Sequence, residues 1–375
     1  MSVLDELGKS NSMISVLHIL YELRSSGAEI MIKNATPYWK EKGIVQHVLS
    51  TAQTMGDFAN DLSHKGVIIH HIPFSNTIDF FDKFFCFVRH NHFNVVHIHV
   101  ERTFLTYSVL ARIARVPVII RTLHSTYMFE GLTRFNRAVR RWMVRVLGVI
   151  QVSVSAAIQE NEKKRFHNPT LQINNWYDDS MFYPPSKNER ANARKKYKLS
   201  KNQKVIISVG NCAPVKNHES IIRALSLIKN EGFRLEYWHV GEEDVEKREQ
   251  KLVSELNLNN IVKFWGRQSN VRDFLWAADV YIMPSFHEGL SIAMLEAIAT
   301  QIPVVLARSP GLDHWADSFS EIIYSETSPE DLANKLSQAL QKSIKRDKNN
   351  LKEFTSNFCI DQGAKKYLEL YESRK

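Results

Sequence analysis

The chain has 375 residues, 44% of them apolar and 24% charged, which is more than one hydrophobic core usually holds, so two domains are expected. With 10% aromatic residues, 14 Gly and 11 Pro, the composition excludes a disordered or collagen-like chain. The net charge of +9 is unevenly placed, because residues 101–200 hold 18 Lys and Arg against 7 Asp and Glu. Such a basic stretch attracts nucleic acid, anionic lipid or phosphorylated substrates, and charge alone does not choose among them.

The first half alternates apolar, β-branched runs with amphipathic stretches, a pattern typical of buried parallel strands joined by helices. The predicted strands are 15–20, 45–50, 67–73, 95–100, 116–123 and 149–155. Pro184 and Pro185, followed by a polar and basic stretch to Lys204, interrupt this pattern. We therefore predict a Rossmann-like α/β domain over residues 1–184 and a linker with a short helix after it.

The second half repeats the alternation without a visible sequence duplication, which predicts a second Rossmann-like domain over residues 185–354. A C-terminal helix, 355–375, is expected to pack back on the first domain. Because ligands bind outside the carboxyl ends of parallel strands, two such domains facing each other would enclose a central cleft. The predicted strands are 205–210, 235–241, 261–266, 280–284, 303–307 and 321–324, and the helices between them are 218–230, 246–256, 271–278, 291–300 and 329–343.

Several classes of protein lack support in the sequence. The longest stretches without a charged residue have 14 residues, against roughly 20 apolar residues for a membrane-spanning helix. A signal peptide begins with basic residues, whereas this sequence has Asp5 and Glu6 before its first apolar run. We therefore expect no secretory signal. The three cysteines lie far apart without a CxxC pair, so we expect a reducing cytoplasm and neither a disulfide framework nor a cysteine zinc site.

Common catalytic and cofactor motifs are also missing. No GxGxxG follows a predicted strand, and the chain has no GxxxxGK[ST], HExxH or GxSxG sequence. These absences disfavour dinucleotide-dependent dehydrogenases, P-loop enzymes, zinc proteases and α/β-hydrolases. His97 and His99 are two positions apart on a predicted strand, so their side chains lie on the same face. No carboxylate motif accompanies them, and a structural role is favoured over metal binding.

The segment from Pro284 to Ala297 carries the strongest chemical signal. Glu288 and Glu296 lie eight positions apart, the first after a strand and the second about two turns into a helix. Free backbone N–H groups and the positive end of the helix dipole favour a phosphate near Gly289 and Leu290. Carboxylates on either side can accept hydrogen bonds from sugar hydroxyls, so the pattern suits a nucleotide-sugar diphosphate.

This segment resembles the E-x7-E motif of the family 4 retaining glycosyltransferases, which have the GT-B fold. The resemblance extends over residues 15–310, and three further segments carry most of it. The segment 208–218 is similar to the family's glycine-turn-lysine element, Ser26-Gly27-Ala28-Glu29 to its Gly-Gly-x-Glu loop, and 174–184 to its Asn-Gly-Val-Asp and Phe-x-Pro segment. Departures from the family pattern include Asn211, where an arginine is usual, Trp176, Gln301 and Asp313.

The resemblance implies a role for each matching position. Glu296 would bind the donor ribose, Glu288 a hydroxyl of the donor sugar, and Lys216 the diphosphate, with no metal ion and no cofactor. The catalytic residues would be Glu288, His124 and Lys216, with His124 touching the transferred sugar. The remaining donor-binding positions would be Gly27, Gly210, Asn211, Arg267, Gly289 and Leu290.

Residues 133–148 predict a basic amphipathic helix, with Phe135, Val139, Trp142 and Val146 at helical spacing and five arginines on other sectors. Two interpretations stay open. The helix covers the sheet with solvated arginines, or it contacts anionic headgroups or a polyprenyl-diphosphate acceptor. Nucleic acid is disfavoured because no recognised binding module or aromatic platform is present.

The sequence and the resemblance together predict a cytoplasmic retaining glycosyltransferase, peripheral at the inner face of the membrane. It would move a sugar from a nucleoside-diphosphate donor to a hydroxyl of a lipid-linked or surface polysaccharide precursor. The alternatives are a UDP-sugar epimerase of the same fold, which needs acid and base residues across the cleft, and a catalytically silent sugar-nucleotide-binding homologue.

Overall fold

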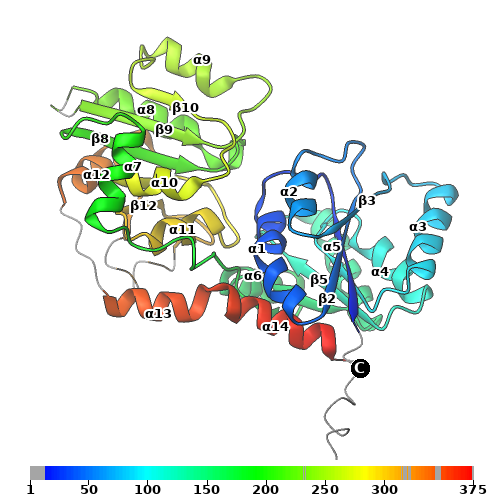
Figure 1. The fold of residues 1–375 in the computed structure, drawn as a ribbon. Helices are drawn as coiled ribbons and strands as arrows, with labels where there is room; N and C mark the ends of the chain where they lie inside the picture. The colour runs from blue at the N-terminus through cyan, green and yellow to red at the C-terminus, as the bar shows by residue number, and fades with distance from the viewer. Residues whose placement is uncertain are drawn as a thin grey trace, which may run out of the picture. The chain divides into compact units, whose positions relative to one another are not determined.

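The structure is a computed structural model that describes residues 13–230, 232, 234–313, 315, 319, 322–342 and 348–373. The chain divides into two compact units, one formed by the residues up to Asn174 together with those from Ile360, the other by Asn175–Cys359 (Figure 1). Each unit is a parallel β-sheet flanked by helices. The predicted fold class, two Rossmann-like α/β domains, is confirmed.

Unit 1 holds a seven-stranded parallel sheet in the order β3-β2-β1-β4-β5-β6-β7. Its strands are β1 (Ile14–Leu20), β2 (Ile44–Ser50), β3 (Ile68–His71), β4 (Val95–Ile98), β5 (Val118–Leu123), β6 (Ile150–Ser153) and β7 (Leu171–Gln172). Its helices are α1 (Gly27–Glu41), α2 (Phe58–His64), α3 (Ile78–His90), α4 (Phe104–Ile113), α5 (Gly131–Val146), α6 (Ala156–Phe166) and α14 (Ile360–Glu372).

Unit 2 holds a six-stranded parallel sheet in the order β10-β9-β8-β11-β12-β13. Its strands are β8 (Gln203–Val209), β9 (Arg234–Val240), β10 (Val262–Phe264), β11 (Val280–Met283), β12 (Val304–Ala307) and β13 (Ile322–Ser325). Its helices are α7 (Lys187–Lys196), the 3-10 turn Pro214–Lys216, α8 (His218–Ile228), α9 (Arg248–Glu255), α10 (Val271–Ala277), α11 (Ile292–Ala299), α12 (Pro329–Gln341) and α13 (Lys348–Phe358).

Both sheets have the strand order of a doubly wound fold, in which the order reverses at one point. In unit 2 the reversal lies between β8 and β11, and in unit 1 between β1 and β4. A crevice forms at such a point because the two loops that leave neighbouring strands diverge to opposite faces of the sheet. The loops after β8 and β11, which carry Lys216 and Glu288, therefore share the carboxyl edge at the switch point of unit 2.

Apolar side chains explain why the helices pack where they do. In unit 2, the apolar faces of α8, α9 and α12 bury Ile221, Leu225, Leu252 and Leu336 against β8, β9, β11 and β12. In unit 1, α3 and α4 contribute Phe80, Phe84, Phe104 and Tyr107 to the equivalent layer. At about 25 cal/mol for each Å² of apolar surface removed from water, these layers are the main stabilising contribution of the helices.

The boundaries of the units differ from the predicted domains. The units divide at Asn174/Asn175 and Cys359/Ile360, whereas the sequence placed the breaks at 184/185 and 354/355. The segment before Pro184 already packs within unit 2, because Asn175 Nδ2 donates to the Leu290 carbonyl at 2.9 Å and Trp276 Nε1 to the Tyr183 carbonyl at 3.0 Å. A break in composition therefore marks the linker about ten residues later than the contacts do.

The C-terminal helix returns to unit 1, as the predicted fold has it. Trp39 Nε1 on α1 donates to the Ala364 carbonyl on α14 at 2.9 Å. Tyr367 and Tyr371 are buried, and their hydroxyls lie 2.8 Å from Thr122 Oγ1 and 3.0 Å from His97 Nδ1. α14 is thus tied to α1, β4 and β5 by polar as well as apolar contacts.

Candidate active site

The loop after β8 presents Lys216. Val209 ends the strand, and Gly210 N donates to the Val240 carbonyl at 2.9 Å, which holds the loop beside the end of β9. The chain then makes a single 3-10 turn, Pro214–Lys216, before α8 begins at His218. The Asn211 side-chain oxygen accepts a hydrogen bond from Glu242 N at 3.1 Å, so this residue ties the loop to the end of β9.

The loop after β11 presents Glu288 to that lysine. Lys216 Nζ donates to Glu288 Oε1 at 2.7 Å, and the Glu288 side chain is 11% exposed. Phe286 N donates to the Val215 carbonyl at 2.9 Å, which joins the backbones of the two loops. The structure therefore brings together two predicted site residues that are 72 positions apart in the sequence.

Gly289 and Leu290 lead into α11, which is capped by the Ser291 hydroxyl accepting from Met294 N. Both residues are buried, and in the described part of the chain their N–H groups make no hydrogen bond. Buried N–H groups at a helix entrance that lack an acceptor favour an anionic ligand. The geometry thus adds two free donors to the ammonium group of Lys216.

Glu296 is the fifth residue of α11, a little more than one turn into the helix and not the two turns predicted, because the helix begins at Ile292. It is buried, as is Tyr281 on β11. Burial first, then the carboxylates of Glu288 and Glu296, raise the pKa of Tyr281 well above its ordinary value. Both glutamates therefore act on the same buried phenol.

Three buried polar atoms in this region have no hydrogen-bond partner among the residues described: Asn175 Oδ1, Tyr281 OH and Ser285 Oγ. Buried polar groups are normally paired, so unpaired ones indicate a ligand or ordered water. The sequence analysis did not place these residues in the site. Asn175 and Ser285 lie in segments that carry the family resemblance, whereas Tyr281 looks like an ordinary strand residue.

Arg267 lies after β10, at the carboxyl edge of the same sheet but two strands away from β8. Gly241 N donates to the Gly266 carbonyl at 3.0 Å, which holds this loop beside the end of β9. Arg267 thus shares the edge with Lys216 and Glu288 without adjoining the switch point.

Gly27 and His124 belong to unit 1. Gly27 is the exposed first residue of α1, and a Cβ atom there would meet nothing within 4 Å. His124 follows β5, and its Nε2 lies 2.9 Å from His99 Nδ1, while His99 Nε2 lies 3.1 Å from His18 Nδ1. Burial lowers the pKa of His124 to about 4, so the three rings form a chain of neutral imidazoles that ends at His124.

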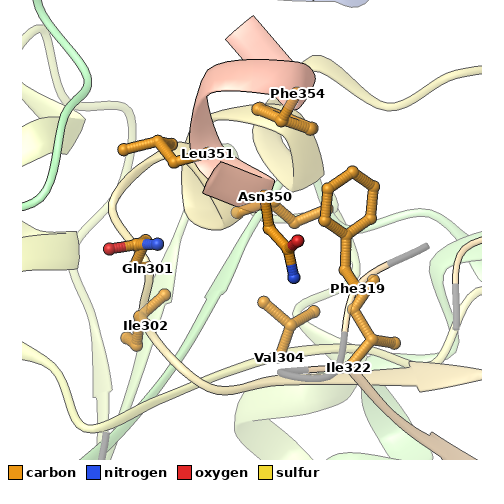
Figure 2. A pocket seen from close by; sticks show the side chains of 9 residues that line it. Gln301, Ile302, Val304, Phe319, Ile322, Asn350, Leu351 and Phe354 are labelled. Atoms are coloured by element: carbon orange, nitrogen blue, oxygen red, sulfur yellow. The ribbon is translucent and has the colours of Figure 1, made fainter. Parts of the chain in front are cut away.

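Two groups of described side chains have the spacing of metal ligands, His18 with His97 and His99, and Cys212 with His218 and His239. Neither contains Lys216 or Glu288. A separate apolar pocket lies between α13 and the β12–β13 edge, lined by Ile302, Val304, Phe319, Ile322 and Phe354 among others (Figure 2). It contains none of the predicted site residues and has the lining of a packing gap rather than of a diphosphate site.

The comparisons with known proteins agree with this geometry. Residues 189–355, most of unit 2, match the family of glycosyl transferases group 1. HepE of Anabaena, solved in complex with UDP and glucose, superposes with a TM-score of 0.77 at 17% identity, over 96% of this chain and 100% of HepE. These matches support a glycosyltransferase with the GT-B fold.

Two relatives by sequence have informative names. CapH of Staphylococcus aureus, a capsular polysaccharide biosynthesis glycosyltransferase, is 24% identical over 76% of this chain and 79% of CapH. The UDP-Gal:α-D-GlcNAc-diphosphoundecaprenol α-1,3-galactosyltransferase of Escherichia coli is 25% identical over 58% of this chain and 59% of that protein. The family and both relatives are named as transferases, so the epimerase alternative is not favoured.

Proposed function

We propose that this protein is a retaining glycosyltransferase that takes a sugar from a nucleoside-diphosphate donor without a metal ion at the diphosphate. The observation that carries the proposal is the Lys216–Glu288 pair at the switch point of unit 2, beside the free N–H groups of Gly289 and Leu290. A cation and two oriented N–H groups at one strand edge can bind a diphosphate and stabilise the charge that develops on it as it leaves.

In this proposal each predicted site residue has one role. Lys216 Nζ and the two amides hold the diphosphate, and Glu288, released from part of its ion pair by the donor, accepts from a hydroxyl of the sugar. Glu296 binds the ribose from within α11, and His124 contacts the transferred sugar from unit 1 as a neutral imidazole. Gly27 lets the ligand approach the entrance of α1, since the glycine is required neither by its φ angle nor by a neighbouring atom.

The acceptor is proposed to be a hydroxyl of a polysaccharide or glycolipid precursor, carried by a polyprenyl diphosphate. Two observations support this choice, the capsular polysaccharide role in the name of CapH and the lipid-diphosphate acceptor in the name of the Escherichia coli galactosyltransferase. The protein would act in the cytoplasm, at the inner face of the membrane. No described helix combines the length and the apolar composition that crossing a membrane requires.

The first prediction concerns the pair itself. Lys216→Ala and Glu288→Ala should each lower the rate of transfer roughly a hundredfold or more, as expected for the loss of one preorganised charge-stabilising group. The measurement is release of nucleoside diphosphate from a panel of UDP-, GDP- and ADP-sugars, with and without polyprenyl-diphosphate glycans as acceptors. Glu219→Ala removes an exposed carboxylate of the same unit, on α8, and should leave the rate unchanged.

The panel also separates the alternatives. An epimerase would return a changed sugar nucleotide without releasing diphosphate, and a silent homologue would bind a donor without consuming it. Wild-type rates in both alanine variants would contradict the site. A product with inverted anomeric configuration in its proton NMR spectrum would contradict retention.

We further propose that α5 binds the anionic surface of a membrane. The structure overturns the interpretation in which its apolar face packs on the sheet, because Phe135 is 70% and Trp142 56% exposed, with Leu132, Val139 and Val146 on the same face. The buried side of the helix is instead held by Arg141, which forms a two-pronged ion pair with buried Glu162 at 2.7 and 3.0 Å.

An exposed apolar stripe flanked by cations is the pattern of a helix that lies in a membrane interface. Arg134 and Arg145 are exposed beside the stripe, so the charge complements anionic headgroups. The interpretation in which all the arginines are solvated also fails at Arg141, since this side chain is buried and paired with Glu162. Because the apolar side of α5 is exposed and Arg141 lies on the buried side, the apolar side is available to lipid.

The second prediction follows from that stripe. The double variant Phe135→Ser, Trp142→Ser should cosediment with vesicles of anionic and neutral phospholipid at least about tenfold more weakly than wild type, because two large apolar groups no longer enter the interface. Ile78→Ser, which removes an even more exposed apolar group from α3, is the control. Binding that ignores both anionic lipid content and salt, or dimerisation through the stripe in sedimentation equilibrium, would contradict a membrane role.

A further inference from the structure

Beneath the Lys216 loop, three side chains from different elements converge. Cys212 lies in the loop after β8, His218 is the first residue of α8, and His239 lies on β9. Each offers one sulfur or nitrogen atom, and these three atoms all lie within 4.8 Å of one another. Cys212 Sγ is 3.4 Å from His239 Nε2. Across a tetrahedral zinc ion, bond lengths of about 2.3 Å to sulfur and about 2.1 Å to nitrogen give a similar separation, roughly 3.6 Å.

The burial and hydrogen bonding of the two histidines suit metal ligands. They are 5% and 1% exposed, and His218 Nδ1 has no hydrogen-bond partner among the residues described. His239 Nδ1 lies 3.4 Å from Ser208 Oγ, which in turn lies 2.6 Å from the Tyr237 hydroxyl. A hydrogen bond at one ring nitrogen fixes the orientation of the imidazole and leaves the other nitrogen to face a metal.

The other group with metal spacing, in unit 1, has a different character. Both nitrogens of His97 are engaged, by the Tyr371 hydroxyl at 3.0 Å and Thr122 Oγ1 at 2.7 Å. Both nitrogens of His99 are engaged as well, by His18 and His124. His18 Nε2 is buried without a partner among the residues described, but most of the ring nitrogens of this group are paired and it holds no thiol, so the observations favour the group in unit 2.

We propose that Cys212, His218 and His239 bind a divalent transition-metal ion, best matched by Zn²⁺, with a water molecule as the fourth ligand. One thiolate and two imidazoles suit Zn²⁺ and leave one position of its tetrahedron to the water molecule. The metal displaces the thiol proton to solvent, so binding strengthens as the pH rises. Because Cys212 and His218 flank residues 213–217, the ion fixes both ends of the loop that carries Lys216.

The site has a structural role and is separate from the diphosphate chemistry, since none of its ligands is Lys216, Glu288 or an amide of 289–290. No cysteine zinc site was predicted from the sequence, because the chain has no CxxC pair. The ligands here are brought together by the pairing of β8 with β9, which places His239 beside Ser208. The inference does not depend on the proposed function, because metal binding is measured directly.

The experiment uses the full chain freed of metal by a chelator and then titrated with Co²⁺. We expect saturation near one ion per chain, with a thiolate-to-cobalt charge-transfer band and the intense visible bands of tetrahedral Co²⁺. Zn²⁺ should displace the cobalt and abolish the spectrum. Cys212→Ser should remove the charge-transfer band, and His218→Gln should weaken Zn²⁺ binding about tenfold or more in competition with a chromophoric chelator.

Two matched controls locate the ion. Cys359→Ser removes another partly buried cysteine of unit 2, and His97→Gln removes one histidine of the group in unit 1. Both should retain the cobalt spectrum. The proposal is overturned if folded wild type binds no Co²⁺ or Zn²⁺, if Cys212→Ser keeps the charge-transfer band, or if His97→Gln loses it.

A measurement on the wild type alone covers the case in which a variant fails to fold. Zn²⁺ should slow alkylation of Cys212 about tenfold or more, as mapped by mass spectrometry, and leave Cys86 unaffected as an internal reference. Equal alkylation of Cys212 with and without Zn²⁺ would overturn the proposal.

Discussion

At Gly311 the backbone has a φ of +89°, and a Cβ atom built there would lie 2.1 Å from the Glu288 carbonyl oxygen. Glu288 N also donates to the Pro310 carbonyl at 3.0 Å, so this turn sets the height of the Glu288 loop. We predict that Gly311→Ala displaces Glu288 from Lys216 and lowers transfer roughly tenfold or more, since small misplacements at a reacting centre are costly. The measurement is the rate on the preferred donor, with the melting temperature recorded in parallel.

The control variant Gly43→Ala separates the effect of backbone strain from the effect of displacing Glu288. Gly43 has a similar φ, +77°, but a Cβ atom there would meet nothing within 4 Å. It should cost only the roughly 1–2 kcal/mol of a strained backbone and leave catalysis intact. If the two variants lowered activity equally, the turn at Gly311 would not position Glu288.

The position of a site residue could be predicted from the sequence where the pattern of strands determines it. Lys216 and Glu288 each follow a buried strand, and parallel strands end at one edge, so the sequence could place both on that edge. It could not show that they form an ion pair, because this requires β8 and β11 to be neighbours. The unpaired side-chain oxygens of Asn175 and Ser285 could not be predicted either, because whether a buried oxygen finds a partner depends on residues far away in the sequence.

Among the elements, α14 is the one whose packing is most distant in sequence from its partners. Tyr371 is buried between His97 and Trp39, its hydroxyl bonded to His97. We predict that Tyr371→Ala costs about 3–5 kcal/mol of stability, as for other large-to-small core changes, and loosens unit 1 alone. Hydrogen exchange followed by mass spectrometry should show lost protection in β1 and β4 while β8 and β11 stay protected.

Glu369→Ala, an exposed change on the same helix, is the control for helix propensity and should leave exchange unaltered. Equal loss of protection in the strands of both units would show that α14 stabilises the molecule as a whole and not unit 1.

Elements with a strong periodic pattern were predicted well, and the others were not. Twelve of the strands were predicted because most of them are apolar runs with buried side chains, whereas β7 has only two exposed residues and leaves no pattern. α13 was not predicted, because its sequence, KNNLKEFTSNF, reads as polar linker. For α5 the helix was predicted and its orientation was not, since periodicity alone does not say which face meets the sheet.

At the scale of the whole molecule, the pH dependence of stability follows from titratable groups that are buried in unit 1. Unit 1 buries His18, His97 and His99 in and after its central strands and half-buries His124, all as neutral rings. Burial lowers the pKa of His18 to about 3 and of His124 to about 4, and lowers those of His97 and His99 well below the ordinary value. One buried carboxyl acts in the opposite sense, since burial raises the pKa of Glu29 to about 7.

The sign of the pH dependence follows from these directions. Between pH 6.5 and the folded pKa values, the unfolded chain binds protons at the four histidines that the folded chain does not, so stability falls as the pH falls, by up to about 1.4 kcal/mol per pH unit for each histidine. Glu29 stabilises the folded state below its unfolded pKa and loses that effect as the pH rises through about 7. Four groups outweigh one, so we predict that the urea midpoint of unfolding drops from about pH 6.5 to about pH 4.5. Circular dichroism at constant ionic strength measures it, and Glu29→Gln, which removes the opposing group, should leave the acid loss in place and steepen it. A midpoint that stays level or rises on acidification would mean that the imidazoles gain protons without unfolding, and the chain of neutral rings behind His124 would then be wrong.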